Sequence, residues 1–393
     1  MIKYNFVRNI KLLRWHSFFT DFSLWAPLAI IYFSRITGSY ALGLSIFSVT
    51  MISSAIFELP TGLISDKQGR VKTLILGAIA FIISAIFYAI GFNYWILFVG
   101  AIFQGLGRSF YSGNNDALLY DNLIETKKTD DFSEHSGKIG SMSQIALAIS
   151  GLSGGIIAYF SFSVLMWISV IPPIICLFLG LKLTEVKKIS QEQENIFVHI
   201  KIALKNFKSN FKLRQISLVS IIRFGIGEAA WQFRSAFIAT LWPIWAIGIS
   251  QVLSNIGAAV SFHFSGRLIK KFTAIKILIF ENFVTKSIDI TSLIFANIFS
   301  PAIMSLTSLL YGVSETSKQK LLQQEFTDNQ RATMGSLTSL FGSIFFAIFA
   351  IFLGILADKF GPRNALLIKS LISCMVFIPL LRFKKADSKN VSK

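Results

Sequence analysis

Charged residues are scarce in this chain. Asp, Glu, Lys and Arg together make up 15% of its 393 residues, whereas about 25% is usual for a soluble protein. The mean hydropathy is correspondingly high, at +0.62. This composition leaves little polar surface for contact with water and indicates an integral membrane protein.

Acidic residues are rarer than basic ones, with 20 Asp and Glu against 38 Lys and Arg, for a formal net charge of +18 at pH 7. Most of the basic residues fall at the termini and in every second connection between apolar runs. That bias is the positive-inside signature, so we expect both termini in the cytoplasm and the basic surface against anionic lipid. Nucleic acid is therefore not an expected partner.

Cysteine is nearly absent. Cys176 and Cys374 each lie in an apolar run, and the four histidines show no ligand spacing, so no metal site, disulfide or cofactor is expected. The motifs H-E-x-x-H and G-x-x-x-x-G-K-[ST] are missing, which argues against a membrane-embedded enzyme and an ATP-driven pump. A G-x-S-x-G match at residues 151–155 lies inside an apolar run, so we attribute it to chance.

Long apolar runs dominate the sequence. Crossing about 30 Å of hydrocarbon takes around 20 residues, and the crossing segments must be helical because lipid offers the backbone no hydrogen-bond partners. We predict an all-α polytopic protein with twelve transmembrane helices, at residues 13–34, 39–62, 73–92, 94–119, 137–159, 163–183, 213–236, 243–265, 276–297, 300–320, 332–356 and 364–383.

The longest polar connection divides the chain into residues 1–184, a six-helix bundle, and residues 213–393, a second bundle with a short tail. The connection itself, residues 185–212, carries apolar side chains on one helical face between residues 196 and 207. It is interpreted either as an amphipathic helix on the cytoplasmic membrane surface or as a basic linker without fixed structure.

The two halves repeat short patterns. Gly62, Asp66 and Lys72 correspond at an offset of 204 to Gly266, Lys270 and Lys276, and residues 155–158 correspond at an offset of 199 to residues 354–357. Together these matches indicate duplicated, pseudo-symmetric bundles, an architecture in which a transporter's substrate site lies between the repeats.

The connection at residues 62–72 reads G-x-I-x-D-x-x-G-R-x-K. Gly62 and Gly69 permit a tight turn, and we expect Asp66 near a helix start, where a carboxylate is stabilised by free N–H groups. This pattern resembles the most diagnostic motif of the major facilitator superfamily. Residues 331–337 and 354–361 resemble the family's segments entering and leaving the eleventh span, so the resemblance covers essentially the whole chain.

The resemblance implies the family's fold and a secondary transporter that works by alternating access. We expect a monomer and no enzymatic activity. It further implies that Asp66 faces the opposite half and that Arg70 pairs with an acid at the end of span four, for which Asp121 is the best match. The predicted gating residues are Gly62, Asp66, Gly69, Arg70, Lys72 and Asp121. The alternative is that the basic residues here only anchor the turn at the membrane surface.

Residues 109–121 resemble span four of a bacterial efflux-like subgroup. Two motifs of proton-linked drug antiporters are incomplete, however. The pattern R-x-x-Q-G-x-G has Ala101 in place of its arginine, with Arg108 further along, and G-P-x-x-G-G reads S-G-L-S-G-G at residues 150–155, with Gly151 in place of its proline. Drug–proton antiport is consistent with these motifs but not specified by them.

Ionisable residues inside spans are costly and mark functional positions by default. The family resemblance places the spans that carry most of them around a central cavity. Relative movement of Arg108 or Arg223 against Asp21 or Glu228 would load or release a proton, although fixed ion pairs between helices remain the alternative. Trp231 offers a stacking surface. The predicted transport and proton-coupling residues are Asp21, Arg108, Asp116, Arg223, Glu228, Trp231 and Glu315.

Four further charged residues are given structural roles. Lys286 and Asp289 lie three residues apart and are expected to neutralise each other. Glu281 is expected to reach water at the cytoplasmic end of its span, and Lys369 to extend toward the outer interface.

These observations predict proton-coupled efflux of small organic or drug-like molecules across a bacterial inner membrane, with protons, substrate and membrane lipids as partners. Proton-coupled uptake of a polar solute or nutrient is the alternative, and a gated channel is a third class. Substrate, direction and coupling ion are left open by the sequence.

Overall fold

The computed structural model describes residues 2–186, 207, 210–326 and 331–391. Every regular element in these residues is helical. The chain forms two compact units, one of Met1–Gln191 with Pro243–Val252 and one of Glu192–Trp242 with Leu253–Lys393. The predicted domain boundaries at residues 184 and 213 stay a prediction, and the expected amphipathic segment lies almost wholly outside the described residues.

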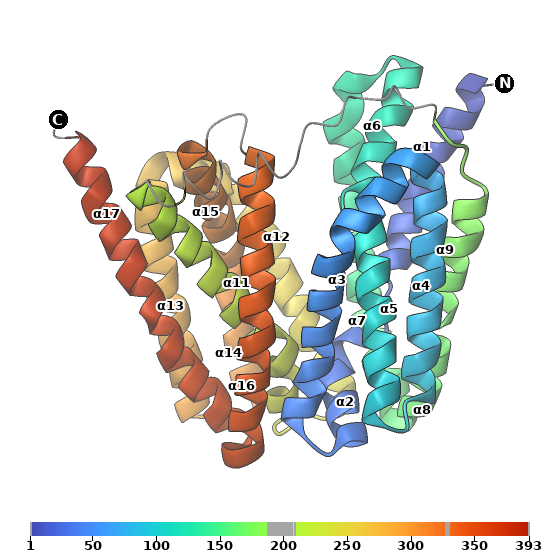
Figure 1. Ribbon diagram of the computed structural model, residues 1–393. Helices are drawn as coiled ribbons and strands as arrows, with labels where there is room; N and C mark the ends of the chain where they lie inside the picture. Colours follow the sequence, from blue (N-terminus) through green and yellow to red (C-terminus); the bar gives the residue numbers. More distant parts are fainter. Residues whose placement is uncertain (1, 187–206, 208–209, 327–330, 392–393) are drawn as a thin grey trace. The chain divides into compact units, whose positions relative to one another are not determined.

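The first unit is built from long helices that run side by side (Figure 1). Its closest helix pairs are α3 with α5, α4 with α5, and α1 with α7. The elements are α1 (Ile2–Asp21), η1 (Ala26–Leu28), α2 (Ala29–Thr37), α3 (Tyr40–Gln68), α4 (Arg70–Ile90), α5 (Tyr94–Tyr111), α6 (Asn114–Thr126), η2 (Thr129–Asp131), α7 (Phe132–Phe160), α8 (Phe162–Ile168), α9 (Ile171–Leu181) and, from later in the chain, η3 (Ile244–Ala246).

The second unit packs α11 against α16 and α17, and α13 against α15. Its elements are α11 (Phe211–Ile238), α12 (Ile247–Phe272), whose first turns belong to the first unit, α13 (Ala274–Ile294), α14 (Ser300–Ser305), η4 (Leu306–Leu310), α15 (Tyr311–Glu325), α16 (Arg331–Ser373), η6 (Cys374–Val376) and α17 (Phe377–Val391). The long α16 contains a turn at Gly361, where the backbone leaves helical geometry.

Several helices begin directly after a short polar residue that precedes an apolar run. The side chains of Ser39, Asn93, Ser161 and Asn210 each accept a hydrogen bond from the backbone N–H three residues on, at 3.0–3.3 Å. Each thereby satisfies one of the N–H groups that a helix start leaves unpaired.

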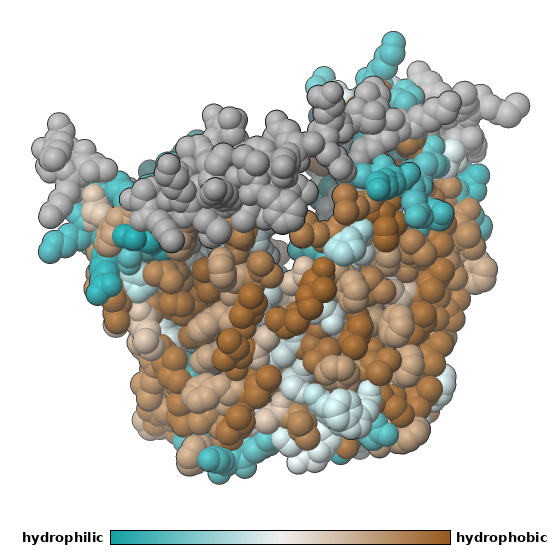
Figure 2. Space-filling model, in the orientation of Figure 1, coloured by the Kyte–Doolittle hydropathy of each residue, from teal (hydrophilic) through white to brown (hydrophobic). Residues whose placement is uncertain are grey.

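Apolar side chains cover the middle of the visible face of each unit, and hydrophilic ones gather toward the ends (Figure 2). By length and composition, six helical stretches among the described residues could cross a membrane. They are Tyr40–Gln68, Arg70–Ile90, Thr129–Phe160, Phe162–Leu181, Ile244–Phe272 and Met334–Asp387. The last of these contains two of the predicted spans, and the count of twelve stays a prediction.

Several predicted spans are broken rather than continuous. Residues 22–25 separate α1 from η1 and α2, residues 112–113 separate α5 from α6, and residues 169–170 separate α8 from α9. The predicted loop at 63–72 is, in contrast, mostly helical, because α3 continues to Gln68 and only Gly69 lies between it and α4.

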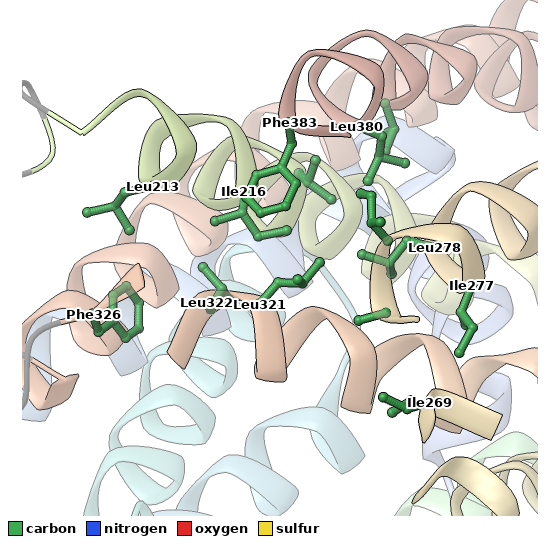
Figure 3. Close-up of a cluster of buried hydrophobic side chains, with 14 of the residues drawn as sticks. Leu213, Ile216, Ile269, Ile277, Leu278, Leu321, Leu322, Phe326, Leu380 and Phe383 are labelled. Carbon is green, nitrogen blue, oxygen red and sulfur yellow. The ribbon is translucent and has the colours of Figure 1, made fainter. Parts of the chain in front are cut away.

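One end of the second unit is held by an apolar core (Figure 3). Leu213 and Ile216 of α11 lie among Leu321 and Leu322 of α15 and Leu380 of α17. All five side chains are buried. This core fixes the helices from which the charged residues described next project.

Candidate functional site

A cavity of about 540 Å³ lies within the second unit. That volume is in the range of small-molecule sites. Nine Asp, Glu, Lys and Arg side chains line it, contributed by α11, α13, α15 and α16: Arg223, Glu228, Arg234, Glu281, Lys286, Asp289, Glu315, Lys318 and Lys369. Apolar and aromatic side chains share the wall, including Phe224, Trp231 and Met304.

Arg223 links three helices at this cavity. Its Nη1 lies 2.5 Å from Oε2 of Glu281 on α13, and its Nη2 donates to Oγ of Ser314 on α15 at 2.8 Å. Glu281 is 7% exposed, so the expectation that it reaches water was wrong. A buried carboxylate without a cation is costly, which is why Glu281 instead neutralises Arg223.

A second ion pair joins Lys318 and Glu315 on successive turns of α15, at 2.7 Å. Glu315 also accepts a hydrogen bond from Gln319 at 3.2 Å. The predicted site residue Glu315 is therefore part of the cavity wall and is held in place by its own helix.

The third pair corrects two expectations. Asp289 lies 3.6 Å from Nζ of Lys369 on α16, and Lys369 is 7% exposed rather than extended to the outer interface. Lys286, expected to neutralise Asp289, has no ion pair among the described residues. Helix packing brings Lys369 to the acid, which sequence spacing alone could not indicate.

Glu228 differs from the other cavity carboxylates. It accepts a hydrogen bond from Nε2 of Gln232 at 2.8 Å, and no cation of the described residues forms an ion pair with it. Arg234 donates to the carbonyl oxygen of Pro301 and to Oγ of Ser305, both at 3.3 Å.

The structure thus brings four predicted transport residues, Arg223, Glu228, Trp231 and Glu315, to one cavity. The sequence missed Glu281, Lys318 and Asn282 as members of this site. Charge inside an apolar run was a usable signal for Glu281, but its partner is 58 residues away.

The other three predicted transport residues lie in the first unit, on different helices. Asp21 is the last residue of α1 and half-buried, and Arg108 is in the last turn of α5 and exposed. Asp116 was expected within a continuous span four; it lies instead beyond the break, exposed in the first turn of α6. No described contact joins these three side chains.

The turn between α3 and α4 carries the predicted gating residues. Nε of Arg70 lies 2.5 Å from Oδ2 of Asp121 on α6, so the pairing implied by the family resemblance is present. Asn114 strengthens the same link, since its side chain accepts from Ser65 at 2.9 Å and donates to the carbonyl oxygen of Arg70 at 2.8 Å. The gating role itself stays a prediction.

The expectation that Asp66 lies near a helix start was wrong. It is exposed in the last turn of α3, because that helix runs on to Gln68. Gly62 and Lys72 are also exposed. The carboxylate that stabilises the start of α4 belongs to Glu185, whose Oε1 and Oε2 accept from the backbone N–H groups of Arg70 and Val71 at 2.9 Å each.

Glu185 also explains why Gly69 is needed. The backbone at Gly69 has φ of +99°, and a Cβ there would lie 2.5 Å from Oε2 of Glu185. The sequence analysis missed Glu185. A usable signal was its position directly after the last apolar span of the first half, ahead of the basic Lys187 and Lys188.

Comparison with curated proteins gives two informative relatives. The chain is 32% identical over 172 residues to an uncharacterized transporter of Buchnera aphidicola subsp. Acyrthosiphon pisum, covering 44% of this chain and 42% of that protein. It is 29% identical over 116 residues to a glucose transport protein of Synechocystis sp., covering 30% and 23% respectively. The matches span less than half the length of either relative.

Solved structures resemble the fold over nearly its full length. A point mutant of the nucleoside transporter NupG superposes with a TM-score of 0.84, at 14% identity, over 95% of this chain and 99% of that one. A bacterial homologue of the human lysosomal transporter Spinster superposes with a TM-score of 0.77, at 13% identity, over 97% and 98%.

The sequence model of the Major Facilitator Superfamily matches residues 15–381. Together with the helical fold, this match indicates a multi-pass membrane protein. The chain belongs to the Major Facilitator Superfamily.

Proposed function

We propose that this protein is a proton-coupled secondary transporter that exports small organic solutes across a bacterial inner membrane by alternating access. Both termini would lie in the cytoplasm, as the distribution of basic residues indicates. The observation that carries the proposal is the cavity of the second unit, in which ionisable side chains are concentrated inside a bundle of helices.

Glu228 is the strongest candidate for the coupling proton. The carboxylates of Glu281, Asp289 and Glu315 each form an ion pair with a cation, so adding a proton to any of them would break that pair. Among the described residues, Glu228 is hydrogen-bonded only to the neutral amide of Gln232. It therefore gains a proton without breaking an ion pair.

The test uses purified protein in vesicles that enclose a pH-sensitive dye. Addition of a transported solute should change the internal pH in the unmodified protein, whereas Glu228→Gln should abolish that proton movement and retain solute exchange. Glu125→Gln, an exposed acid on α6, is the matched control. Proton movement that is unchanged in Glu228→Gln would remove this residue from the mechanism.

The turn between α3 and α4 is proposed to favour the state in which the cytoplasmic side is closed. A contact made in only one state biases the equilibrium between states. Arg70→Met and Asp121→Asn should each slow transport, and the double variant should be no slower than the slower single variant, because both remove the same ion pair. Additive losses in the double variant would indicate that Arg70 and Asp121 act separately.

Asp66→Asn should also impair transport with membrane insertion intact.

Uptake is the second candidate. Its support is the polarity of the cavity and the similarity to proteins described as a glucose transport protein and a nucleoside transporter. In cells, dissipating the proton gradient should raise the accumulation of an exported solute and lower that of an imported one.

A further inference from the structure

Several hydrogen-bond donors at the cavity of the second unit have no acceptor among the described residues. Glu228, Glu281, Asp289 and Glu315 each already accept from, or pair with, a neighbouring side chain. On the donor side, Lys286 has no hydrogen bond or ion pair among the described residues. A molecule that fills the cavity would therefore meet donors that have no protein acceptor.

Four further polar groups at the cavity wall are unpaired. Nδ2 of Asn282, Nδ2 of Asn255, Nε of Arg234 and the hydroxyl of Ser254 are buried and have no hydrogen-bond partner among the described residues, and the first three are donors only. Asn282 is 2% exposed. Leaving a buried donor unpaired is unfavourable, so several on one wall indicate a place that a ligand completes.

The donors are arranged on three helices of the wall. Asn282 and Lys286 are four residues apart on α13, a spacing that places both on the same helix face. Asn255 projects from α12 and Arg234 from α11, and all four residues line the same cavity.

The charged side chains that line the cavity also favour an anionic ligand. Five cations and four carboxylates line the cavity, so one positive charge is in excess when all are ionised. Three cation–carboxylate pairs are formed. Among the described residues Lys286 forms no ion pair within 4 Å, and the acids that attract it, Asp289 and Glu281, are each already paired with another cation. A ligand with one negative charge would neutralise the excess, whereas a phosphate dianion would reverse it.

We infer that the transported solute is a small organic carboxylate, whose anionic group binds Lys286 and the amides of Asn282 and Asn255. Phe224, Trp231 and Met304 form the apolar part of the wall and would contact the solute's carbon skeleton. This assignment rests on the proposed transport function and goes beyond it by naming the substrate class.

The experiment measures ligand binding without transport. The purified protein in detergent is heated in the presence of a library of small carboxylic acids, each paired with its own neutral primary amide, and of phosphate monoesters. At least one acid should raise the unfolding temperature while its amide does not, because only the carboxylate pairs with the cation.

Variants then locate the binding group. Lys286→Met should weaken binding of that acid by roughly 30-fold or more, the effect of removing one member of a buried charge pair. Lys286→Arg should retain part of the affinity. Lys276→Met is the matched control, since Lys276 is exposed near the start of the same helix, and it should bind as the unmodified protein does. Size-exclusion profiles establish that each variant is folded.

Several results would overturn the assignment. These are equal stabilisation by an acid and its amide, stabilisation by phosphate monoesters or neutral compounds alone, no stabilising acid in the library, and undiminished binding in Lys286→Met. A different result would contradict the proposed function alone. If a carboxylate bound through Lys286 but its movement into vesicles did not respond to a pH gradient, proton coupling would be contradicted and the substrate assignment would stand.

Discussion

One threonine lies in a backbone conformation that only glycine adopts easily. Thr273, between α12 and α13, has φ of 63° and ψ of 143°. Gly69, at the equivalent turn between α3 and α4, has φ of 99° and ψ of 158°. The two residues are separated by 204 positions, the offset of the repeated sequence pattern, so the duplicated halves share a turn geometry that Thr273 adopts under strain. Such strain costs about 1–3 kcal/mol.

Thr273→Gly should therefore stabilise the protein, by about 1 kcal/mol after the extra chain entropy of glycine is subtracted. Unfolding of the purified protein in detergent, followed by circular dichroism, measures the effect. Thr338→Gly, in the regular helix α16, should be destabilising and serves as the control. A destabilised Thr273→Gly would show that the turn is not strained.

The sequence anticipated one side-chain pairing at the turn before α4 and missed the other. Arg70 and Asp121 were paired through a family motif. Glu185 caps the same turn from 115 residues away in the sequence, and an isolated acid carries no information about which helix start it will meet. For the same reason Lys286 was assigned to Asp289 by spacing, whereas packing places Lys369 beside that acid.

Glu185→Ala should destabilise the first unit by about 1 kcal/mol, since two N–H groups at the start of α4 lose their carboxylate partner. The rate of hydrogen exchange at the backbone amides of Arg70 and Val71 should increase in the same variant. Glu125→Ala removes an exposed acid from α6 and should change neither quantity. Unaltered exchange at Arg70 in Glu185→Ala would contradict the capping role.

At the scale of elements, the positions of helices followed from apolar runs, and their interruptions did not. Hydropathy cannot distinguish a straight helix from one with a break, because both are apolar throughout. The break at residues 22–25 is accommodated by close packing: a Cβ on Gly154 of α7 would lie 2.0 Å from the carbonyl oxygen of Leu24. Close approach of this kind is a common use of glycine in membrane helices.

Gly154→Ala should consequently cost about 1–3 kcal/mol, the range for overpacking a tight contact. Gly137→Ala is the matched control on the same helix, because nothing lies within 4 Å of its position. Alanine there should be neutral or stabilising by up to about 1 kcal/mol. Thermal unfolding of both variants in detergent gives the comparison, and equal stability of the two would contradict the packing described at Leu24.

At the scale of the whole molecule, the class of protein was predictable because lipid imposes composition, length and charge placement on the entire chain. The family resemblance in the sequence is confirmed by the match over residues 15–381. What could not be predicted is which cavity groups remain unpaired, since that depends on how α11, α12, α13, α15 and α16 pack together. The unpaired groups are the ones that the proposed transport cycle uses.

The central claim is that the cavity opens to one side of the membrane at a time. Cys176 and Cys374, the free cysteines of the described residues, are replaced by Ala, and Ala230 of the cavity wall is replaced by Cys. A membrane-impermeant maleimide is then applied to either side of oriented vesicles, with and without a pH gradient. Lys127→Cys, in a predicted cytoplasmic connection, reports vesicle orientation.

Alternating access predicts that the gradient increases labelling of residue 230 from one side of the membrane and decreases it from the other. Labelling that is unaffected by the gradient and proceeds equally from both sides would indicate a channel, and would contradict alternating access.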